Sequence, residues 1–278
     1  MVRKIVVDSA ADLLQLPAMA LEVVPLKINV GSTCFVDDAR LDVAQLTACL
    51  QGHKGRSVTA CPAPGEYLAA FGQAEEIICV TITSALSGSN NAAQVAAGEY
   101  MEAHPGRRVH VVDSLSTGPE MALLTEFLAR RTQEGADFAS LCTEAEAYRA
   151  RTRLVFSLES IRNLANNGRV SPAVAALVGL MGIRIVGRAS DTGDFQQMAK
   201  CRGEKKALAA LSSAMQEMGW QGGRVRIHHC GNEGAAMALS DGLRAVHPAA
   251  EITLSSTRGL CSFYAEAGGL LIGFEGEV

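Results

Sequence analysis

A short apolar run that ends in a hydroxyl-rich loop constrains this chain more than any other stretch. Residues 77–97 read IICVTITSALSGSNNAAQVAA. The β-branched residues at the start predict a buried strand, and the alanine-rich end predicts a helix. A strand, a polar loop and a helix form half of a βαβ unit, so the loop should lie at the carboxyl edge of a parallel sheet. Open α/β folds bind their ligands at that edge.

The loop carries groups that suit a bound anion. Ser84, Ser87 and Ser89 offer hydroxyls, and Gly88 lets a ligand approach the backbone closely. The free N–H groups at the start of the helix and the helix dipole both favour negative charge. The competing interpretation is that Ser89 or Asn90 only caps the helix.

The same order of strand, polar loop and helix recurs around Asp8 and Asp113. This alternation predicts a doubly wound, mostly parallel sheet. Residues 21–30 are predicted as a further strand, near an edge because of Pro25. A length of 278 residues indicates more than one domain. A charged helix end gives way to a new strand near residues 151–156. We therefore predict two α/β domains, residues 1–152 and 153–278.

Composition excludes several classes of function. A net charge of −4 gives no general attraction to nucleic acid, and 5% aromatic residues are too few for a base-stacking platform. No apolar run reaches the ~20 residues of a membrane span, and the first residues lack the pattern of a signal peptide. We expect a cytoplasmic protein without integral membrane contact.

The eight cysteines show neither a CxxC pair nor a zinc-binding spacing, so they are interpreted as free thiols. His228, His229 and Cys230 are adjacent in a predicted strand, where neighbouring side chains point to opposite faces. A metal site is therefore not expected.

Seven segments, in this order, resemble the motifs of one family. They are VDSAADL (7–13), VPL (24–26), TACPAPGEY (59–67), SALSGS (84–89), VDS (112–114), LESIR with GRVS (158–162 and 168–171), and KCRGEKKA (200–207). The family patterns that they resemble include TDSTADL, TSQPSPGEF, SSxLSGT and KxRGRKKA. The motifs cover nearly the whole chain, and the chain is identified as a member of the DegV family, bacterial fatty-acid-binding proteins of the FakB type with the EDD fold.

The resemblance implies a long-chain fatty acid held between two α/β domains, with no other cofactor. It implies that the protein is not itself an enzyme, but presents the fatty-acid carboxylate to a separate ATP-dependent fatty acid kinase (FakA), which makes the acyl phosphate. Carried over by motif, Thr59 and Ser87 would hydrogen-bond the carboxylate, beside Gly88 and the hydroxyl of Ser89. Arg202 would lie near the head group or at the kinase surface.

The last loop departs from the family pattern GxHTGPGxxGxxF. Here residues 259–269 read GLCSFYAEAGG, which puts Tyr264 where a histidine is expected and Glu266 where a glycine is expected. A tyrosine still donates a hydrogen bond, but it takes up no proton near neutral pH. A carboxylate at Glu266 would repel a fatty-acid head group if it pointed inward. Tyr264 is therefore predicted as a ligand-binding donor.

Two alternatives stay open from the residues. The altered loop would suit another small anionic amphiphile, and the serines would suit a serine-dependent hydrolase. The hydrolase is disfavoured because the chain has no GxSxG elbow. For the acyl tail, the candidate walls are a charge-free helix predicted over residues 172–180, Met181 and residues 270–272. For any one of them, ordinary core packing is the competing interpretation.

Overall fold

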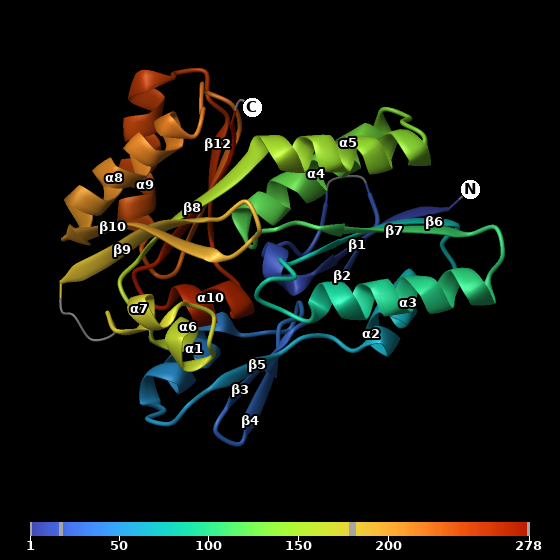
Figure 1. Ribbon diagram of the computed structural model, residues 1–278, viewed down its shortest axis with the longest axis horizontal. Coiled ribbons are helices and arrows are strands. Elements are labelled where there is room, and N and C mark those ends of the chain that lie inside the picture. Colours follow the sequence, from blue (N-terminus) through green and yellow to red (C-terminus); the bar gives the residue numbers. More distant parts are fainter. Residues whose placement is uncertain (1, 17–18, 178–181, 277–278) are drawn as a thin grey trace.

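The computed structural model describes residues 2–16, 19–177 and 182–276. Its first sheet is fully parallel, with the strand order β2-β1-β6-β7. The strands are β1 (Arg3–Asp8), β2 (Leu21–Val24), β6 (Glu76–Thr81) and β7 (Arg108–Asp113). Helices lie on both faces of this sheet (Figure 1): α2 (Pro64–Phe71) and α3 (Ser89–Ala103) on one, α4 (Pro119–Gln133) and α5 (Phe138–Arg151) on the other. The predicted doubly wound parallel sheet is confirmed.

A small antiparallel sheet, absent from the prediction, follows β2. It has the order β4-β3-β5 and consists of β3 (Lys27–Val30), β4 (Thr33–Val36) and β5 (Val58–Ala60), with α1 (Val43–Gly52) between β4 and β5. The single strand predicted over residues 21–30 is wrong, because the chain leaves the parallel sheet at Pro25. Proline has no N–H for the strand ladder and fixes its own φ, so β2 and β3 can belong to different sheets.

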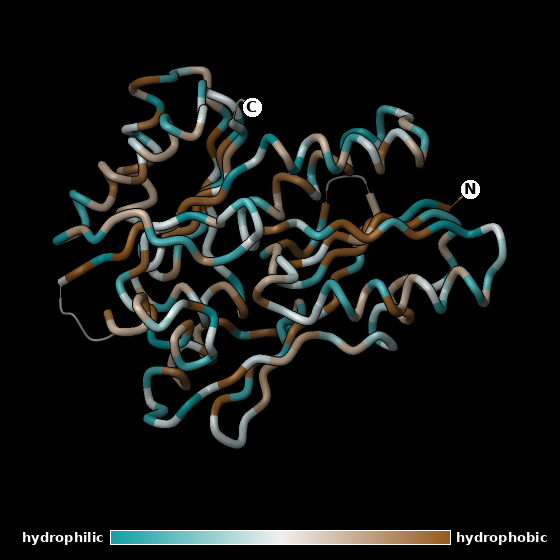
Figure 2. The backbone as a smooth tube through the Cα atoms, in the orientation of Figure 1, coloured by the Kyte–Doolittle hydropathy of each residue, from teal (hydrophilic) through white to brown (hydrophobic). Residues whose placement is uncertain are grey.

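The second half of the chain forms a six-stranded mixed sheet of order β10-β9-β8-β13-β11-β12. Among the described residues of this sheet, only β11 and β12 pair in parallel. The strands are β8 (Thr152–Leu158), β9 (Ile183–Ala189), β10 (Phe195–Arg202), β11 (Val225–His229), β12 (Ile252–Ser256) and β13 (Leu270–Glu275). Strand β10 had not been predicted, because its alternating exposure carries little apolar signal. Figure 2 shows that the strands of both large sheets form the hydrophobic interior of the fold.

The helices of the second half lie on opposite faces of its sheet. Helices α8 (Glu204–Glu217) and α9 (Glu233–Val246) bury their apolar sides against one face. The short helices α6 (Arg162–Asn166), α7 (Pro172–Ala175) and α10 (Gly259–Ala265) contribute to the core on the other. The helix predicted over residues 172–180 is shorter than expected, because α7 ends at Ala175; Leu180 and Met181 lie outside the described residues.

The two halves share buried surface. Helix α4 packs on β13 so closely that a Cβ on Gly273 would lie 2.4 Å from the backbone nitrogen of Glu120. The small sheet packs on α10, because Phe263 joins a buried cluster with Ile28 and Leu46. The predicted division after residue 152 falls where α5 ends and β8 begins, and it stays a prediction.

The buried start of α4 makes the stability of the fold depend on pH. Glu120 is 6% exposed, and burial raises the pKa of its carboxyl to about 7, although the hydroxyls of Ser116 and Thr152 act in the opposite direction. Since this value lies above that of an unfolded glutamate, the folded state binds the proton more tightly. The stability that protonated Glu120 contributes to the fold is fully present below the pKa of Glu120 in the unfolded chain, and it is lost as the pH rises through about 7.

We therefore expect Glu120→Gln to match the native protein in thermal stability near pH ~5 and to exceed it near pH ~8. Melting temperatures across this range test the expectation. Asp8 and Asp37, whose pKa values burial raises to about 6, give both proteins the same slope at lower pH. Parallel stability curves for the two proteins between pH ~5 and ~7 would contradict the assignment to Glu120, because the native protein alone should show the extra decline there.

Candidate functional site

A cavity of about 310 Å³ lies between the two halves of the fold. The loops that follow β6 and β7 form one side, so the cavity meets the parallel sheet at its carboxyl edge, as predicted. Strand β8, the β9–β10 hairpin and α10 form the other side. Most of the wall is apolar, and polar side chains gather in a few places. This combination is typical of small-molecule binding sites.

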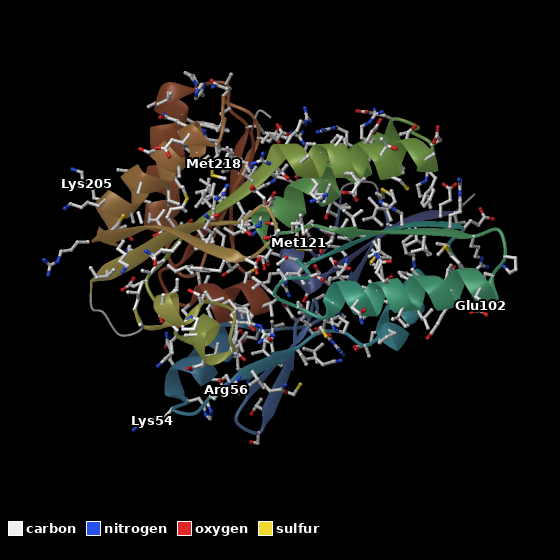
Figure 3. The ribbon with its side chains drawn as sticks, in the orientation of Figure 1. Lys54, Arg56, Glu102, Met121, Lys205 and Met218 are labelled. Carbon is white, nitrogen blue, oxygen red and sulfur yellow. The ribbon has the colours of Figure 1, made fainter. Side chains whose placement is uncertain are left out.

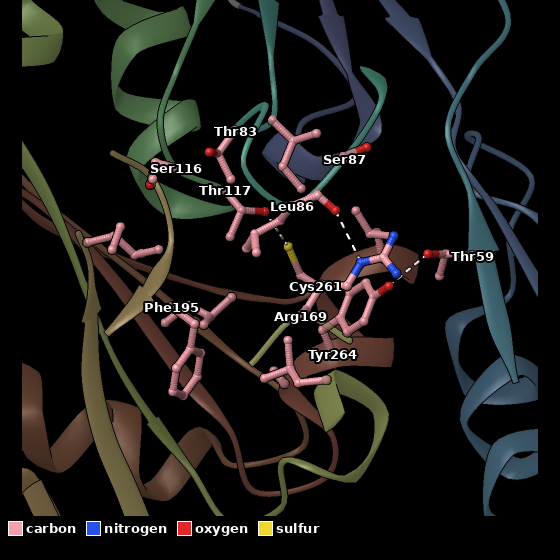
Figure 4. Close-up of a pocket in the computed structure, with 18 of the residues that line it drawn as sticks. Thr59, Thr83, Leu86, Ser87, Ser116, Thr117, Arg169, Phe195, Cys261 and Tyr264 are labelled. Atoms are coloured by element: carbon pink, nitrogen blue, oxygen red, sulfur yellow. Dashed lines mark hydrogen bonds between the residues drawn. The ribbon is translucent and has the colours of Figure 1, made fainter. Parts of the chain in front are cut away.

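One end of the cavity gathers donors from four parts of the chain (Figure 4). Thr59 comes from β5, Ser87 and Gly88 from the loop after β6, Tyr264 from α10, and Arg169 from the segment after α6. The hydroxyls of Thr59 and Tyr264 are 2.8 Å apart, so one donates to the other. Hydroxyls and a guanidinium together offer several donors to a carboxylate and supply the compensating charge that a buried anion requires.

Local structure fixes each of these groups. Thr59 pairs with Ile28 in the small sheet, so its side chain is held by a strand rather than by a free loop. Arg169 donates from Nε to the carbonyl oxygen of Leu86 at 3.1 Å, and it also donates to the carbonyl of Asn167. A Cβ on Gly88 would lie 3.2 Å from the sulfur of Cys61, which explains why a residue without a side chain suits this position.

Ser89 and Arg202 do not line this cavity, whereas the other four predicted residues do. Ser89 is buried, lies 2.6 Å from the hydroxyl of Tyr67, and donates to Asp8 at 2.7 Å. Because α3 begins at Ser89, with Gly88 at the N-cap, Ser89 does not cap the helix either. Arg202 ends β10 and is exposed.

Glu266 points away from the end of the cavity that gathers the donors, the donor-rich end. Its carboxylate accepts the backbone N–H of Asn163 at 2.8 Å and lies 3.9 Å from the guanidinium of Arg162. It borders a second, more polar cavity between α1, α6 and α10. The repulsion that an inward Glu266 would exert on an anionic ligand therefore does not arise in this arrangement.

The other end of the cavity is apolar and contains an aromatic pair. The rings of Phe156 and Phe195 lie 4.7 Å apart between centroids, and both line the cavity. A Cβ on Gly187 would lie 2.6 Å from the ring of Phe156, so the glycine makes room for that ring. Of the predicted wall residues 270–272, only Leu271 lines the cavity, since alternate residues of a strand face opposite sides.

Sequence reasoning missed Arg169, Phe156 and Phe195. Arg169 lies in the segment GRVS that contributed to the family resemblance, so its position in a motif was the available signal. The two phenylalanines belong to separate strands, and their meeting depends on the pairing of β8, β9 and β10. No sequence spacing indicates that meeting.

No group of three or more histidine, cysteine or acidic side chains converges to hold a metal within the described ranges. His228 instead lies 3.0 Å from a carboxylate oxygen of Asp12. Within the same ranges, no helix combines the length and the apolar character needed to cross a bilayer.

Comparisons with known proteins agree with this architecture. The model of a family described as "Uncharacterised protein, DegV family" matches residues 3–276. A DegV domain-containing protein of Streptococcus pneumoniae is 43% identical over 276 residues, which cover 98% of each chain.

Two solved structures superpose over nearly the whole length. A DegV family protein from Eubacterium eligens, loaded with heptadecanoic acid, is 40% identical with a TM-score of 0.96, covering 99% of this chain and 100% of its own. The Fatty Acid Kinase (Fak) B3 protein of Streptococcus pneumoniae, loaded with linoleic acid, is 42% identical with a TM-score of 0.97, covering 100% of both chains.

Proposed function

The chain belongs to the DegV family, and on that premise we propose that it binds one long-chain fatty acid and presents the carboxylate to a separate kinase. The observation that carries the proposal is the cavity between the two halves of the fold, which has one donor-rich end and one apolar end. An amphiphile with an anionic head and an aliphatic tail matches this distribution. Relatives at 40% and 42% identity hold heptadecanoic and linoleic acid.

The apolar end supplies most of the affinity. Each buried CH₂ group contributes about 0.8 kcal/mol, so a tail of many carbons contributes more than the head group can. The donor-rich end sets orientation, because a carboxylate placed anywhere else in the cavity would lose its hydrogen-bond partners. The carboxylate would accept bonds from Thr59, Ser87 and Tyr264 and pair with Arg169.

The chain would act as the carrier, and the kinase would supply ATP and the catalytic groups. A carboxylate oxygen attacks the γ-phosphorus of ATP, the bond to the bridging oxygen breaks, and ADP leaves. The donor-rich end opens beside the exposed residues Ala60 and Gly88, which would give a partner access to the carboxylate. Arg202 lies outside the cavity, so we place it at the kinase surface. Lys205, three residues further on, projects from the body of the protein (Figure 3).

The geometry gives no support to a serine hydrolase. The hydroxyl oxygen of Ser87 accepts the backbone N–H of Ser89 at 3.3 Å. No histidine lines this cavity within the described ranges, so Ser87 has no base to activate it there. Among the two binding hypotheses, nothing in the cavity favours a head group other than a carboxylate.

Mass spectrometry of the lipid released from the purified protein tests the binding function. We expect an even-chain fatty acid in about equimolar amount. Incubation of the loaded protein with ATP and a fatty acid kinase should then yield the acyl phosphate, and neither protein should yield it alone. Release of a different lipid, or of none, would contradict the proposed ligand.

The aromatic pair leads to a prediction about chain length. Phe156→Ala should open the apolar end and shift the bound lipids toward longer chains, with a gain of about 0.8 kcal/mol for each CH₂ that the new space admits. Competition between fatty acids of increasing length measures the shift. Phe127→Ala is the matched control, because Phe127 stacks on Tyr148 at 4.1 Å and does not line the cavity. An unchanged preference in Phe156→Ala would place the end of the tail elsewhere.

A further inference from the structure

Helix α10 contributes to both ends of the cavity. Leu260, Cys261 and Ala265 belong to the apolar wall, and Tyr264 belongs to the donor-rich end. The opposite side of the helix packs on the small sheet and on α1, where Phe263 is fully buried. The position of α10 on the small sheet and α1 therefore decides where the hydroxyl of Tyr264 lies.

A buried carboxylate holds the first residues of α10. Asp37 is 0% exposed and accepts the backbone N–H of Gly259 at 3.0 Å and that of Leu260 at 2.9 Å. The contact is close, since a Cβ on Gly259 would lie 2.6 Å from the Asp37 carboxylate. The backbone N–H of Arg258, just before the helix, donates to Oδ1 of Asp12 at 2.9 Å.

The small sheet holds both ends of α10. Asp37 follows β4 directly, and its own N–H donates to the carbonyl oxygen of Leu26 at 2.9 Å. At the far end of the helix, the hydroxyl of Tyr264 meets Thr59 of β5 at 2.8 Å. Leu260 and Tyr264 are four residues apart and share one face of the helix. One three-stranded sheet thus fixes the start of the helix and supplies the partner for the side chain near its end.

We propose that Asp37 is a positioning residue for the head-group site, which holds α10 in register so that the hydroxyl of Tyr264 reaches the ligand carboxylate beside Thr59. The inference rests on the proposed function. Its physical basis is the steep dependence of a hydrogen bond on distance: a slip of the helix by a fraction of a turn would move the hydroxyl out of range.

The surroundings of Asp37 are consistent with a carboxylate that is ionised in use. Burial raises its pKa to about 6, the nearby charge of Asp12 acts in the same direction, and hydrogen bonds from Leu260, Ser9 and Gly259 oppose both. Near neutral pH the group is therefore mostly charged, and charged acceptors form the stronger hydrogen bonds with backbone N–H groups.

A double-mutant cycle between Asp37 and Tyr264 tests the proposal. Oleate affinity is measured by calorimetry on delipidated native protein, Asp37→Asn, Tyr264→Phe and the combined variant. We expect Asp37→Asn to weaken binding about tenfold when Tyr264 is present, and by less than about twofold when Phe replaces it. Gly259→Ala, which pushes the helix away from Asp37, should show the same dependence on Tyr264.

Asp42→Asn is the matched control. Asp42 accepts the N–H of Gln45 at the start of α1 at 3.0 Å, so it is also a helix-capping carboxylate, but it does not line the cavity. We expect it to leave oleate affinity unchanged. A loss of affinity in Asp37→Asn that is the same with Tyr264 or Phe at position 264 would overturn the proposal, because Asp37 would then act through general stability.

Two further outcomes separate this inference from the proposed function. If Tyr264→Phe binds oleate as tightly as the native protein, the positioning role of Asp37 is contradicted, whereas the fatty-acid-binding function is not. If the delipidated native protein binds no fatty acid, both the proposed function and the positioning role of Asp37 are contradicted.

Discussion

Replacement of Arg169 by methionine is expected to weaken oleate binding by about 10- to 150-fold. The reason is that Arg169 is the cation at the donor-rich end, and a charge-assisted bond to a buried carboxylate contributes about 1.5–3 kcal/mol. Methionine keeps most of the length of the side chain and removes the charge. Calorimetry on delipidated protein measures the loss.

Oleyl alcohol provides the control for this experiment, because it has the same tail and no charge. Its affinity should be similar for the native protein and for Arg169→Met. Arg188→Met is the control variant, since Arg188 donates to Gln196 on the β9–β10 hairpin and does not line the cavity. If the affinities for oleate and oleyl alcohol fall together, then Arg169 acts by holding the loop at Leu86 rather than by pairing with the carboxylate.

The largest effect on stability is expected at the contact between α4 and the second sheet. Gly273 lies in β13 between β8 and β11, and an added Cβ would lie 2.4 Å from the nitrogen of Glu120 and 2.5 Å from the carbonyl carbon of Pro119. Backbone atoms on both sides cannot move aside cheaply. We expect Gly273→Ala to lower the free energy of unfolding by about 3 kcal/mol, measured by denaturant titration.

Gly98→Ala is the matched control for that substitution. Gly98 is exposed in α3, and nothing lies within 4 Å of the position of its added Cβ. Alanine favours a helix over glycine, so this variant should gain about 0.5–1 kcal/mol. A Gly273→Ala protein as stable as the native one would show that α4 and β13 can separate without cost.

The parallel sheet was predictable because its signals are local. At Ser84 and Asp113 a β-branched run is followed by a polar loop and a helix, and this order leaves few topologies open. The same unit expected at Asp8 is wrong, because the chain passes there through the 3₁₀ turn Ser9–Ala11 to β2. The small sheet and β10 were not predictable in the same way. Strand β3 follows Pro25, and in the sequence that proline indicates only that a strand lies at the edge of a sheet. Strand β10 alternates mostly between partly exposed and exposed residues, so it carries little apolar signal.

The residues of the candidate site also differ in whether a local signal predicts them. The polar loop containing Ser87 and Gly88 could be predicted as part of a ligand site, because a strand and a helix next to it in sequence fix its place at a sheet edge. Thr59 and Tyr264 were carried over only by motif. Their contact at 2.8 Å joins residues 205 positions apart and requires the small sheet to pack on α10.

The sequence by itself determined the elements whose partners are close along the chain: the strand–loop–helix units, the anion-suited loop and the apolar character of the core. Only the tertiary structure decided which side chains meet across the cavity, since that depends on strand order and on the packing of α10. It brought Arg169 to the head-group end, paired Phe156 with Phe195, and turned Ser89 toward Asp8 and Glu266 toward Asn163. Local preferences act over a few residues, whereas these contacts are set by the burial of distant apolar surfaces against one another.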